Sequence, residues 1–325
     1  MKGGPRAPEA GVRASLLPAL LGLLVFAAVV GASVAVLWRW QLRAYPEWLA
    51  RYPEAPAATA GEAGRAGAPP PARSDASWGV RPAPWPGRPA RARLAVVIDD
   101  WGYGWRAADA FFGLDAPLTV AVIPFLPHSR EQALEARRRG FEVLVHLPME
   151  PEDPALDPGP HAITTRLSSE EIRRRVEEAI DAVPGAVGVS NHMGSRATAD
   201  PRVMEAVLEA VRQRGLFFLD SRTTPRSVVG AVAARMGMPW ARNDLFLDGD
   251  RSVPYVRARL LVAARRALEM GQAVAIGHVQ PATAAALALV LPELRRQGIR
   301  LVPVSELVTG GFAAGLDRTG ALPVR

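Results

Sequence analysis

Short apolar runs of five or six residues recur between residues 94 and 304 and alternate with charged stretches. The runs lack a clean two-residue alternation, which is typical of strands buried on both faces of a parallel sheet. The pattern predicts seven buried strands, at residues 94–98, 118–123, 141–146, 186–190, 216–220, 273–277 and 299–304.

Three of the charged stretches carry helix signals. Ser129 is predicted to cap a helix that ends at Gly140, and Ser168 is followed three residues later by Glu171 in a capping-box pattern. A third helix has Pro201 in its first turn and Gly215 past its end. Strands that alternate with helices predict parallel strands joined by right-handed crossovers. About seven such units favour an α/β fold with an irregular or incomplete (β/α) barrel over an open doubly wound sheet. No Gly-x-Gly-x-x-Gly or phosphate-binding loop follows a strand, which argues against dinucleotide or nucleoside triphosphate binding.

The N-terminal region predicts a membrane anchor. Residues 15–38 are uncharged and almost entirely apolar, they follow a basic segment at 1–14, and about 20 such residues span a bilayer as a helix. The run exceeds the usual apolar core of a signal peptide, so we expect an uncleaved transmembrane signal anchor with the folded domain extracytoplasmic. The alternative is a secreted or periplasmic protein after signal cleavage.

The remaining segments flank one folded region. Residues 39–93 are rich in Pro, Ala and Gly without apolar periodicity, which predicts a linker. Residues 94–308 form the predicted domain, and 309–325 are expected to be a flexible tail.

Composition narrows the chemistry. The chain has no cysteine, which excludes disulfides, thiolate metal sites and a cysteine nucleophile. Its net charge is +7, but Lys2 is the only lysine, and no arginine-rich stretch is interleaved with aromatic residues. We therefore expect no nucleic-acid partner.

Polar residues stand at the ends of several predicted strands, where a (β/α) barrel places its function. They are Asp99 and Asp100, His146, Asn191 and His192, Asp220, and His278, which include three of the five histidines. A single such Asp is more often a helix cap and a single His a loop residue. Together, two histidines and a carboxylate suit a divalent ion such as Zn²⁺. Because adjacent strand residues point in different directions, one of Asp99 and Asp100 is expected to bind the metal and the other to stay free as a base.

Six motifs carry a resemblance to a known family: "IDDWGYG", "TVAVIPFLPHS", "HLPMEP", "SNHMGSR", "LDSRT" and "IGHVQP". In this order they resemble the polysaccharide deacetylases of the NodB-homology type, in the glycoside hydrolase–deacetylase superfamily. The likeness is closer to their divergent, envelope-associated branch and covers about residues 94–308.

The resemblance implies catalytic roles for individual residues. Asp99 matches the general base of the superfamily and His278 its general acid. Asp220 resembles the carboxylate that orients this histidine. Arg196 or Arg222 could restrain Asp99, and spacing does not choose between them.

The resemblance also implies a metal centre that contains Asp100 and His146. The family's second motif usually supplies two histidines four residues apart, but here the second position is Glu150. His192 could fill that place, with Glu150 as a further ligand or as a residue behind the ligands. The expected cofactor is a divalent metal, Zn²⁺ first, with Co²⁺ or Mn²⁺ as alternatives.

These matches predict a metal-dependent enzyme that removes N-acetyl groups from an envelope carbohydrate such as peptidoglycan. Trp101, Tyr103, Trp105 and Asn191 are candidate substrate contacts, although the aromatic rings are equally expected to pack under the first loop. One alternative is a catalytically inactive, membrane-tethered module that binds a glycan or an envelope partner. Another is a metal-dependent esterase. The sequence does not indicate an oligomeric state.

Overall fold

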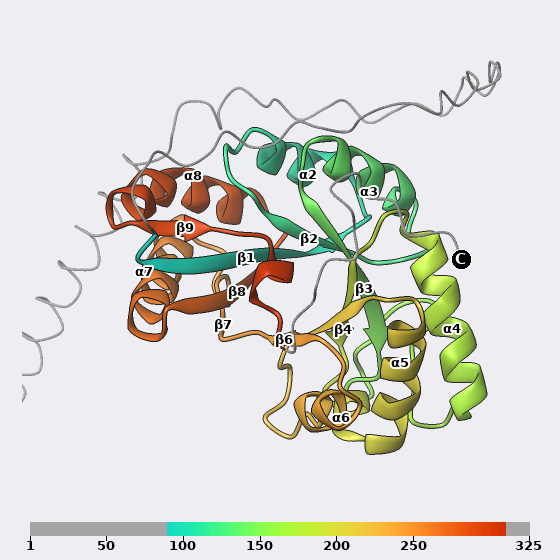
Figure 1. Cartoon of the computed structure of the whole chain (residues 1–325). Helices are drawn as coiled ribbons and strands as arrows, with labels where there is room; N and C mark the ends of the chain where they lie inside the picture. The colour runs from blue at the N-terminus through green and yellow to red at the C-terminus, as the bar shows by residue number, and fades with distance from the viewer. Residues whose placement is uncertain (1–89, 310–325) are drawn as a thin grey trace, which may run out of the picture. The chain divides into compact units, whose positions relative to one another are not determined.

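The computed structural model describes residues 90–309 (Figure 1). The expected anchor at 15–38 lies outside these residues, as do nearly all of the linker at 39–93 and all of the expected tail at 309–325 except Thr309. Within the described part of the chain, no helix combines the length and the apolar character that crossing a bilayer requires.

The described domain is built on one parallel sheet with the strand order β6-β5-β4-β3-β2-β1-β8-β7, in which β9 also pairs with β1. The nine strands are β1 (Ala92–Trp101), β2 (Thr119–Val122), β3 (Glu142–Met149), β4 (Gly188–Met193), β5 (Phe217–Asp220), β6 (Trp240–Arg242), β7 (Leu245–Phe246), β8 (Gln272–His278) and β9 (Ile299–Leu301).

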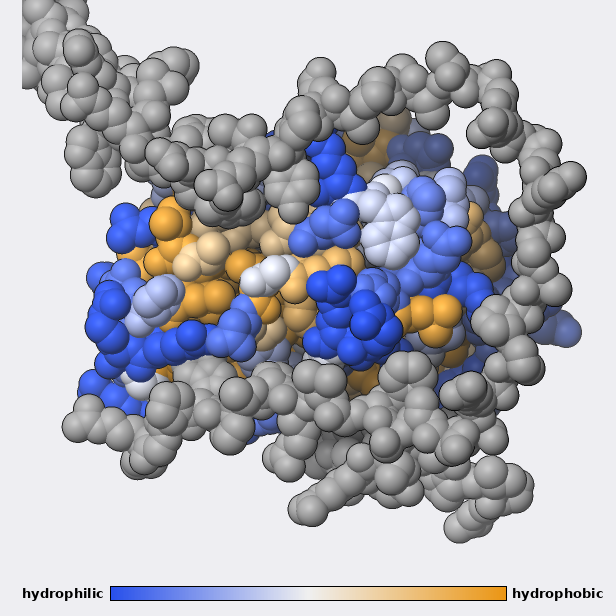
Figure 2. All heavy atoms as spheres, turned by 90° about the horizontal axis from the view of Figure 1, so that it is seen from above, coloured by the Kyte–Doolittle hydropathy of each residue, from blue (hydrophilic) through white to orange (hydrophobic). Residues whose placement is uncertain are grey.

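Helices lie on the outside of this sheet (Figure 1). They are α2 (Trp105–Phe112), α3 (Ser129–Arg138), α4 (Ser169–Ala182), α5 (Pro201–Gln213), α6 (Val229–Arg235), α7 (Val253–Met270) and α8 (Pro281–Arg296), with short 3-10 helices η2 (Ala197–Ala199) and η3 (Val304–Leu307). Figure 2 views the face that carries α2, α3 and α8 from above and shows apolar side chains gathered beside a hydrophilic area.

The two end strands of the sheet, β6 and β7, are separated in the chain by only Asn243 and Asp244. Asn243 donates its backbone N–H to Asp220 of β5, and Asp244 donates its own to Val274 of β8. The sheet therefore curves round into an incomplete barrel, as the sequence predicts. The expected number of strands was too low, because β6 and β7 have three and two residues and leave almost no apolar run.

Each long strand packs one face against helices and the other into the barrel interior. In β1, Leu94, Val96 and Ile98 belong to the outer core, whereas Ala95 and Val97 belong to the inner one. The inner series also includes Leu144 of β3 and Ile276 of β8. Two residues further along these three strands come Asp99, His146 and His278, so the alternation of strand side chains aims all three at the barrel mouth.

The last predicted strand, at 299–304, is shorter than expected, because β9 ends at Leu301. From there Val302, Val304 and Leu307 enter the inner core and fill the barrel. The Val304 N–H is held by Thr119 Oγ1 at 3.0 Å. This segment closes the interior with apolar side chains.

Helix starts follow the capping signals with one exception. Ser168 accepts from the N–H of Glu171, and Asp200 caps α5. Ser129 is not a cap but the first residue of α3, and its hydroxyl instead donates to the Ile123 carbonyl and accepts from Leu126 N–H. Ser129 thus shapes the turn that leaves β2.

Candidate active site

A β-bulge shapes the end of β1. Ile98 pairs with Val120 and Trp101 with Val122, so Asp99 and Asp100 together stand opposite one residue of β2. Asp100 has the left-handed φ of 68°, a conformation that costs most residues about 1–2 kcal/mol and that Asp tolerates better than most. The expectation that the two carboxylates point in different directions was wrong. Both approach His146 Nε2, Asp99 Oδ2 at 3.5 Å and Asp100 Oδ1 at 3.4 Å.

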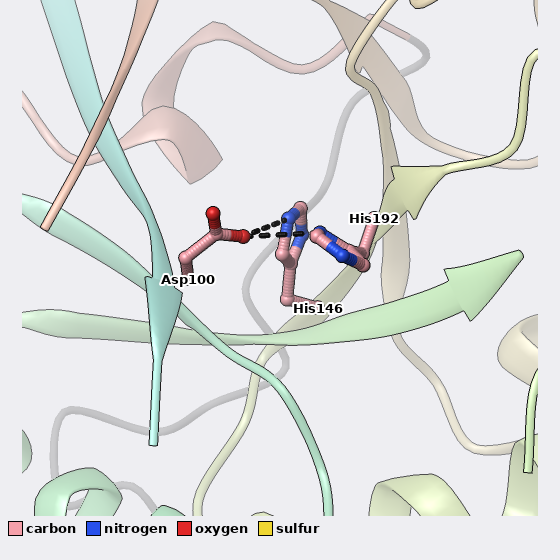
Figure 3. A group of neighbouring side chains, drawn as sticks. All are labelled: Asp100, His146 and His192. Carbon is pink, nitrogen blue, oxygen red and sulfur yellow. Dashed lines mark ion pairs between the residues drawn. The ribbon is translucent and has the colours of Figure 1, made fainter. Parts of the chain in front are cut away.

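Asp100, His146 and His192 form a cluster whose potential ligand atoms lie within 4.8 Å of one another (Figure 3). Asp100 Oδ1 is 3.0 Å from His192 Nδ1. This oxygen is buried, and no group in the described part of the chain meets it at good hydrogen-bond geometry. His146 is oriented from behind, because its Nδ1 lies 2.8 Å from Ser190 Oγ.

The electrostatics of this cluster suit a cation. Burial lowers the pKa of His146 to about 4, so the imidazole is neutral at pH 7. Burial opposes the ionisation of Asp100, but the two adjacent imidazoles outweigh it and hold the pKa of this carboxyl well below its usual range. Neutral imidazoles and an ionised carboxylate are the forms that bind divalent metals. The three residues therefore fit a metal centre.

Glu150 does not belong to this cluster. Its Oε2 accepts from the N–H and the hydroxyl of Thr165, at 2.6 and 2.8 Å, and its Oε1 lies 3.9 Å from Arg196 Nε. Residues four apart are neighbours on a helix, but along an extended strand they are roughly 13 Å apart. His146 and Glu150 lie on such an extended segment, so the structure corrects the expectation that Glu150 is a ligand.

His278 occupies the other side of the barrel mouth, directly paired with Asp99 across β1 and β8. Its Nδ1 lies 2.8 Å from Asp248 Oδ1, and its backbone N–H donates to Asp248 Oδ2 at 2.6 Å. Thr283 Oγ1 also donates to Asp248 Oδ2, at 2.9 Å. Burial by itself would lower the pKa of His278, but the hydrogen bond to Asp248 and the charge of that residue raise the pKa to about 9. His278 is therefore positively charged at neutral pH.

Asp220 does not orient His278, contrary to the expectation from the sequence. Its oxygens accept from the Arg222 N–H at 2.8 Å and the Ser227 hydroxyl at 2.7 Å. In β5, Phe217 and Leu219 face the barrel interior, so the next residue, Asp220, turns outward.

Asp248 takes the place expected of Asp220 and was missed in the sequence. It follows the two-residue strand β7, two positions after Phe246, which packs against the inner core. The available signal was the run "LFLD" at 245–248, which resembles "LFFLD" at 216–220.

Asp99 is buried between the two sides of the site, and among residues 90–309 its Oδ1 finds no hydrogen-bond partner. Burial raises the pKa of Asp99 well above its usual range, His278 lowers it in part, and Asp100 and Asp248 raise it further. Among the described contacts, neither candidate arginine pairs with Asp99: Arg196 donates to the Glu152 carbonyl, and Arg222 donates its backbone N–H to Asp220.

Two of the expected substrate contacts are inaccessible. Trp101 is fully buried and packs on Phe111 and Phe112, with ring centroids 5.9 and 5.4 Å apart. The Asn191 side chain is also buried and binds backbone groups. Both therefore serve the fold and not a ligand.

Tyr103 remains a candidate substrate contact, because it is 64% exposed. It lines a cavity of about 450 Å³ together with Trp105, Gln280, Asp100 and His278. This cavity opens onto residues from both sides of the site and is large enough for a sugar unit.

Comparisons with known proteins agree with this architecture. A sequence profile of the family described as "Divergent polysaccharide deacetylase" matches residues 96–308. An uncharacterised protein of Haemophilus influenzae is 37% identical over 67% of this chain and 77% of its own, and the uncharacterised protein YibQ of Escherichia coli is 36% identical over 66% and 67%. The crystal structure of uncharacterised protein ATU2773 from Agrobacterium tumefaciens aligns with a TM-score of 0.65 and 27% identity, covering 71% of this chain and 97% of that one.

Proposed function

The chain belongs to the family of divergent polysaccharide deacetylases, and from that premise we propose that it is a metal-dependent hydrolase that removes N-acetyl groups from an envelope carbohydrate such as peptidoglycan. One observation carries the proposal. The barrel mouth holds the Asp100–His146–His192 cluster on one side, the charged His278–Asp248 pair on the other and the buried Asp99 between them.

Asp100, His146 and His192 would hold a divalent cation, which lowers the pKa of water and polarises the acetyl carbonyl. Two imidazoles and one carboxylate favour Zn²⁺, and Co²⁺ and Mn²⁺ are the alternatives. Ser190 keeps the His146 ring in place, since its hydroxyl lies 2.8 Å from Nδ1.

Asp99 and His278 would move the protons. In hydrolysis a water oxygen bonds to the acetyl carbon, the carbon–nitrogen bond breaks, and the leaving nitrogen gains a proton. Asp99 would take the proton from water. Burial raises the pKa of this carboxyl, and the positive charges of His278 and of a cation held by Asp100, His146 and His192 would favour its ionised form. His278 donates a proton to the leaving nitrogen, and Asp248 holds its ring charged and oriented. Tyr103 at the edge of the cavity would contact the sugar.

We also propose that the domain acts outside the cytoplasm, tethered by the apolar segment at 15–38 or released after cleavage. An envelope glycan is the substrate that such a location makes available. Fractionation of cells that produce the full chain tests this proposal: recovery of the intact chain in the cytosol contradicts it.

Acetate release tests the enzymatic proposal. The full chain, supplied with Zn²⁺, should release acetate from an N-acetylated glycan and should lose this activity when a chelator removes the metal. Release from aryl acetates without release from glycans indicates an esterase. A chain that binds glycan but releases no acetate with Zn²⁺, Co²⁺ or Mn²⁺ is a binding module, and the proposal then fails.

A further inference from the structure

The segment that carries His192 extends beyond the point where its strand is paired on one side. The ladder between β4 and β5 ends at Ser190 and Leu219, whereas the ladder with β3 continues through His192 and Met193. Opposite His192 stands Pro148, which has no N–H to donate. In the described sheet, strand pairing therefore constrains this end of β4 from the β3 side and not from the β5 side.

Beyond the end of the β4–β5 ladder, the side chains of Asn191 and Thr223 make the hydrogen bonds between the two segments. Asn191 Nδ2 donates to the Met193 carbonyl at 2.8 Å, and Asn191 Oδ1 accepts from the Ser221 N–H at 2.9 Å. Thr223 Oγ1 donates to the same Met193 carbonyl at 2.9 Å. The Asn191 amide and the Thr223 hydroxyl thus both donate to the carbonyl of Met193, the residue that follows His192.

The Met193 backbone needs this support. It has φ 54°, a left-handed conformation that is unusual for a side chain other than Gly, Asn or Asp. Such conformations persist where surrounding contacts hold them and cluster at functional sites. Asn191 and Thr223 supply these contacts on the β5 side.

The loop that supplies the contacts is itself anchored. The Ser221 carbonyl accepts from Asn243 Nδ2 at 3.3 Å, and Asn243 is buried where the sheet passes from β6 to β7. The hydrogen bonds therefore connect Asn243, between β6 and β7, through Ser221 to the turn beside His192.

We propose that Asn191 and Thr223 are positioning residues that set the direction of the His192 imidazole towards Asp100. Neither touches the reacting atoms, and each acts through the Met193 carbonyl. The inference rests on the metal site proposed above. It goes further by assigning part of the site's geometry to the loop after β5, which holds no ligand.

Thr223→Val and Thr223→Ser form a matched pair for the test. Valine keeps the shape of threonine and removes the hydroxyl, whereas serine keeps the donor. Thr223 is exposed, so both variants should fold, and far-ultraviolet circular dichroism checks this. In full chains without metal, the imidazole ¹⁵N resonances of His192 should move in Thr223→Val and stay in place in Thr223→Ser. The five histidines make such spectra simple to assign.

Co²⁺ affinity, followed by the visible absorption of the bound ion, is the second measurement. Loss of a partner behind a metal ligand typically lowers affinity by 10- to 100-fold, and we expect a loss of about 10-fold for Thr223→Val. Asn191→Asp should behave like Thr223→Val, because a carboxylate still accepts from Ser221 but cannot donate to Met193.

Unchanged His192 resonances in a folded Thr223→Val variant overturn the inference, and so does an equal response to valine and serine. If the unmodified chain takes up no Co²⁺, the proposed metal-dependent function fails. The His192 resonances of the metal-free chain then still show whether Thr223 positions the His192 ring.

Discussion

His146 and His278 stand at the same barrel mouth, yet their environments drive their charges in opposite directions. Burial disfavours the charged form of both rings. At His146 the group facing Nδ1 is the Ser190 hydroxyl, and the pKa falls to about 4 in spite of the nearby Asp100. At His278 the group facing Nδ1 is the Asp248 carboxylate, and the pKa rises to about 9. Complete burial therefore keeps the His146 ring neutral, whereas the Asp248 carboxylate beside the less buried His278 ring keeps that ring charged.

This contrast separates two chemical roles within one site. A neutral imidazole is a metal ligand, and a charged one is a proton donor. Groups whose environments push their pKa values apart are the ones that divide acid and base work in enzymes. At pH 7 the site therefore holds one neutral and one charged imidazole at once.

The largest effect is expected from His146→Ala, which removes a ligand. Replacing partners behind ligands costs 10- to 100-fold in metal affinity, so loss of the ligand itself should lower Zn²⁺ affinity by more than about 100-fold. Acetate release should fall to background with it. Competition with a coloured chelator measures the affinity, and near-normal binding would remove His146 from the metal centre.

His278→Ala should remove the proton donor and leave the metal cluster intact. General acid catalysis contributes typically 10²- to 10⁴-fold, and we expect turnover to fall within about that range while Zn²⁺ affinity stays unchanged. Parallel titration and acetate assays on the same preparation provide the comparison with His146→Ala. Retained turnover would refute the acid role, and lost metal would show that the two sides are not separate.

Asp248→Asn should give the smallest of the three effects and sharpen the comparison. Without the carboxylate charge, the pKa of His278 should fall from about 9 towards the ordinary value of about 6.5. The alkaline limb of the pH–rate profile should therefore shift to lower pH by the same amount. Asp220→Asn is the matched control, because Asp220 binds Ser227 and Arg222 and should leave the His278 pKa in place.

Stability should follow the same linkage. Because folding raises the pKa of His278, its stabilising contribution is complete below about pH 6.5 and is lost as the pH rises through about 9. Urea unfolding of the unmodified chain should show this decrease in the free energy of unfolding, and Asp248→Asn should weaken it. An identical pH dependence in both chains would contradict the assigned cause of the raised pKa.

Much of the fold could be predicted from the apolar runs. Seven of the nine described strands overlap a predicted run, and five of the polar residues after them, Asp99, Asp100, His146, His192 and His278, gather at the barrel mouth. The two exceptions, β6 and β7, were missed because two or three residues carry no readable periodicity. That omission also hid Asp248.

The site residues that the sequence misassigns have separate physical causes. Asp220 and Asn191 end apolar runs as His146 does, but the runs are buried on both faces, so the sequence does not reveal which side of the strand faces the interior. Glu150 occupies the second position of the family's motif, but the extended segment after His146 carries it roughly 13 Å away to Thr165. Trp101 lies beyond the bulge and returns to the core.

By itself, the sequence determined where the long parallel strands end, and it thereby placed Asp99, Asp100, His146, His192 and His278 at one edge of the sheet. Only the tertiary structure decided what each one does there. The bulge at Asp100 brought two adjacent carboxylates to one histidine, and the alternation of β5 and β7 chose Asp248 over Asp220 as the partner of His278. The direction and the partner of each side chain are set by contacts between strands that are distant in the chain. The sequence does not contain these contacts, and ionic and ligand contacts act only over a few ångströms.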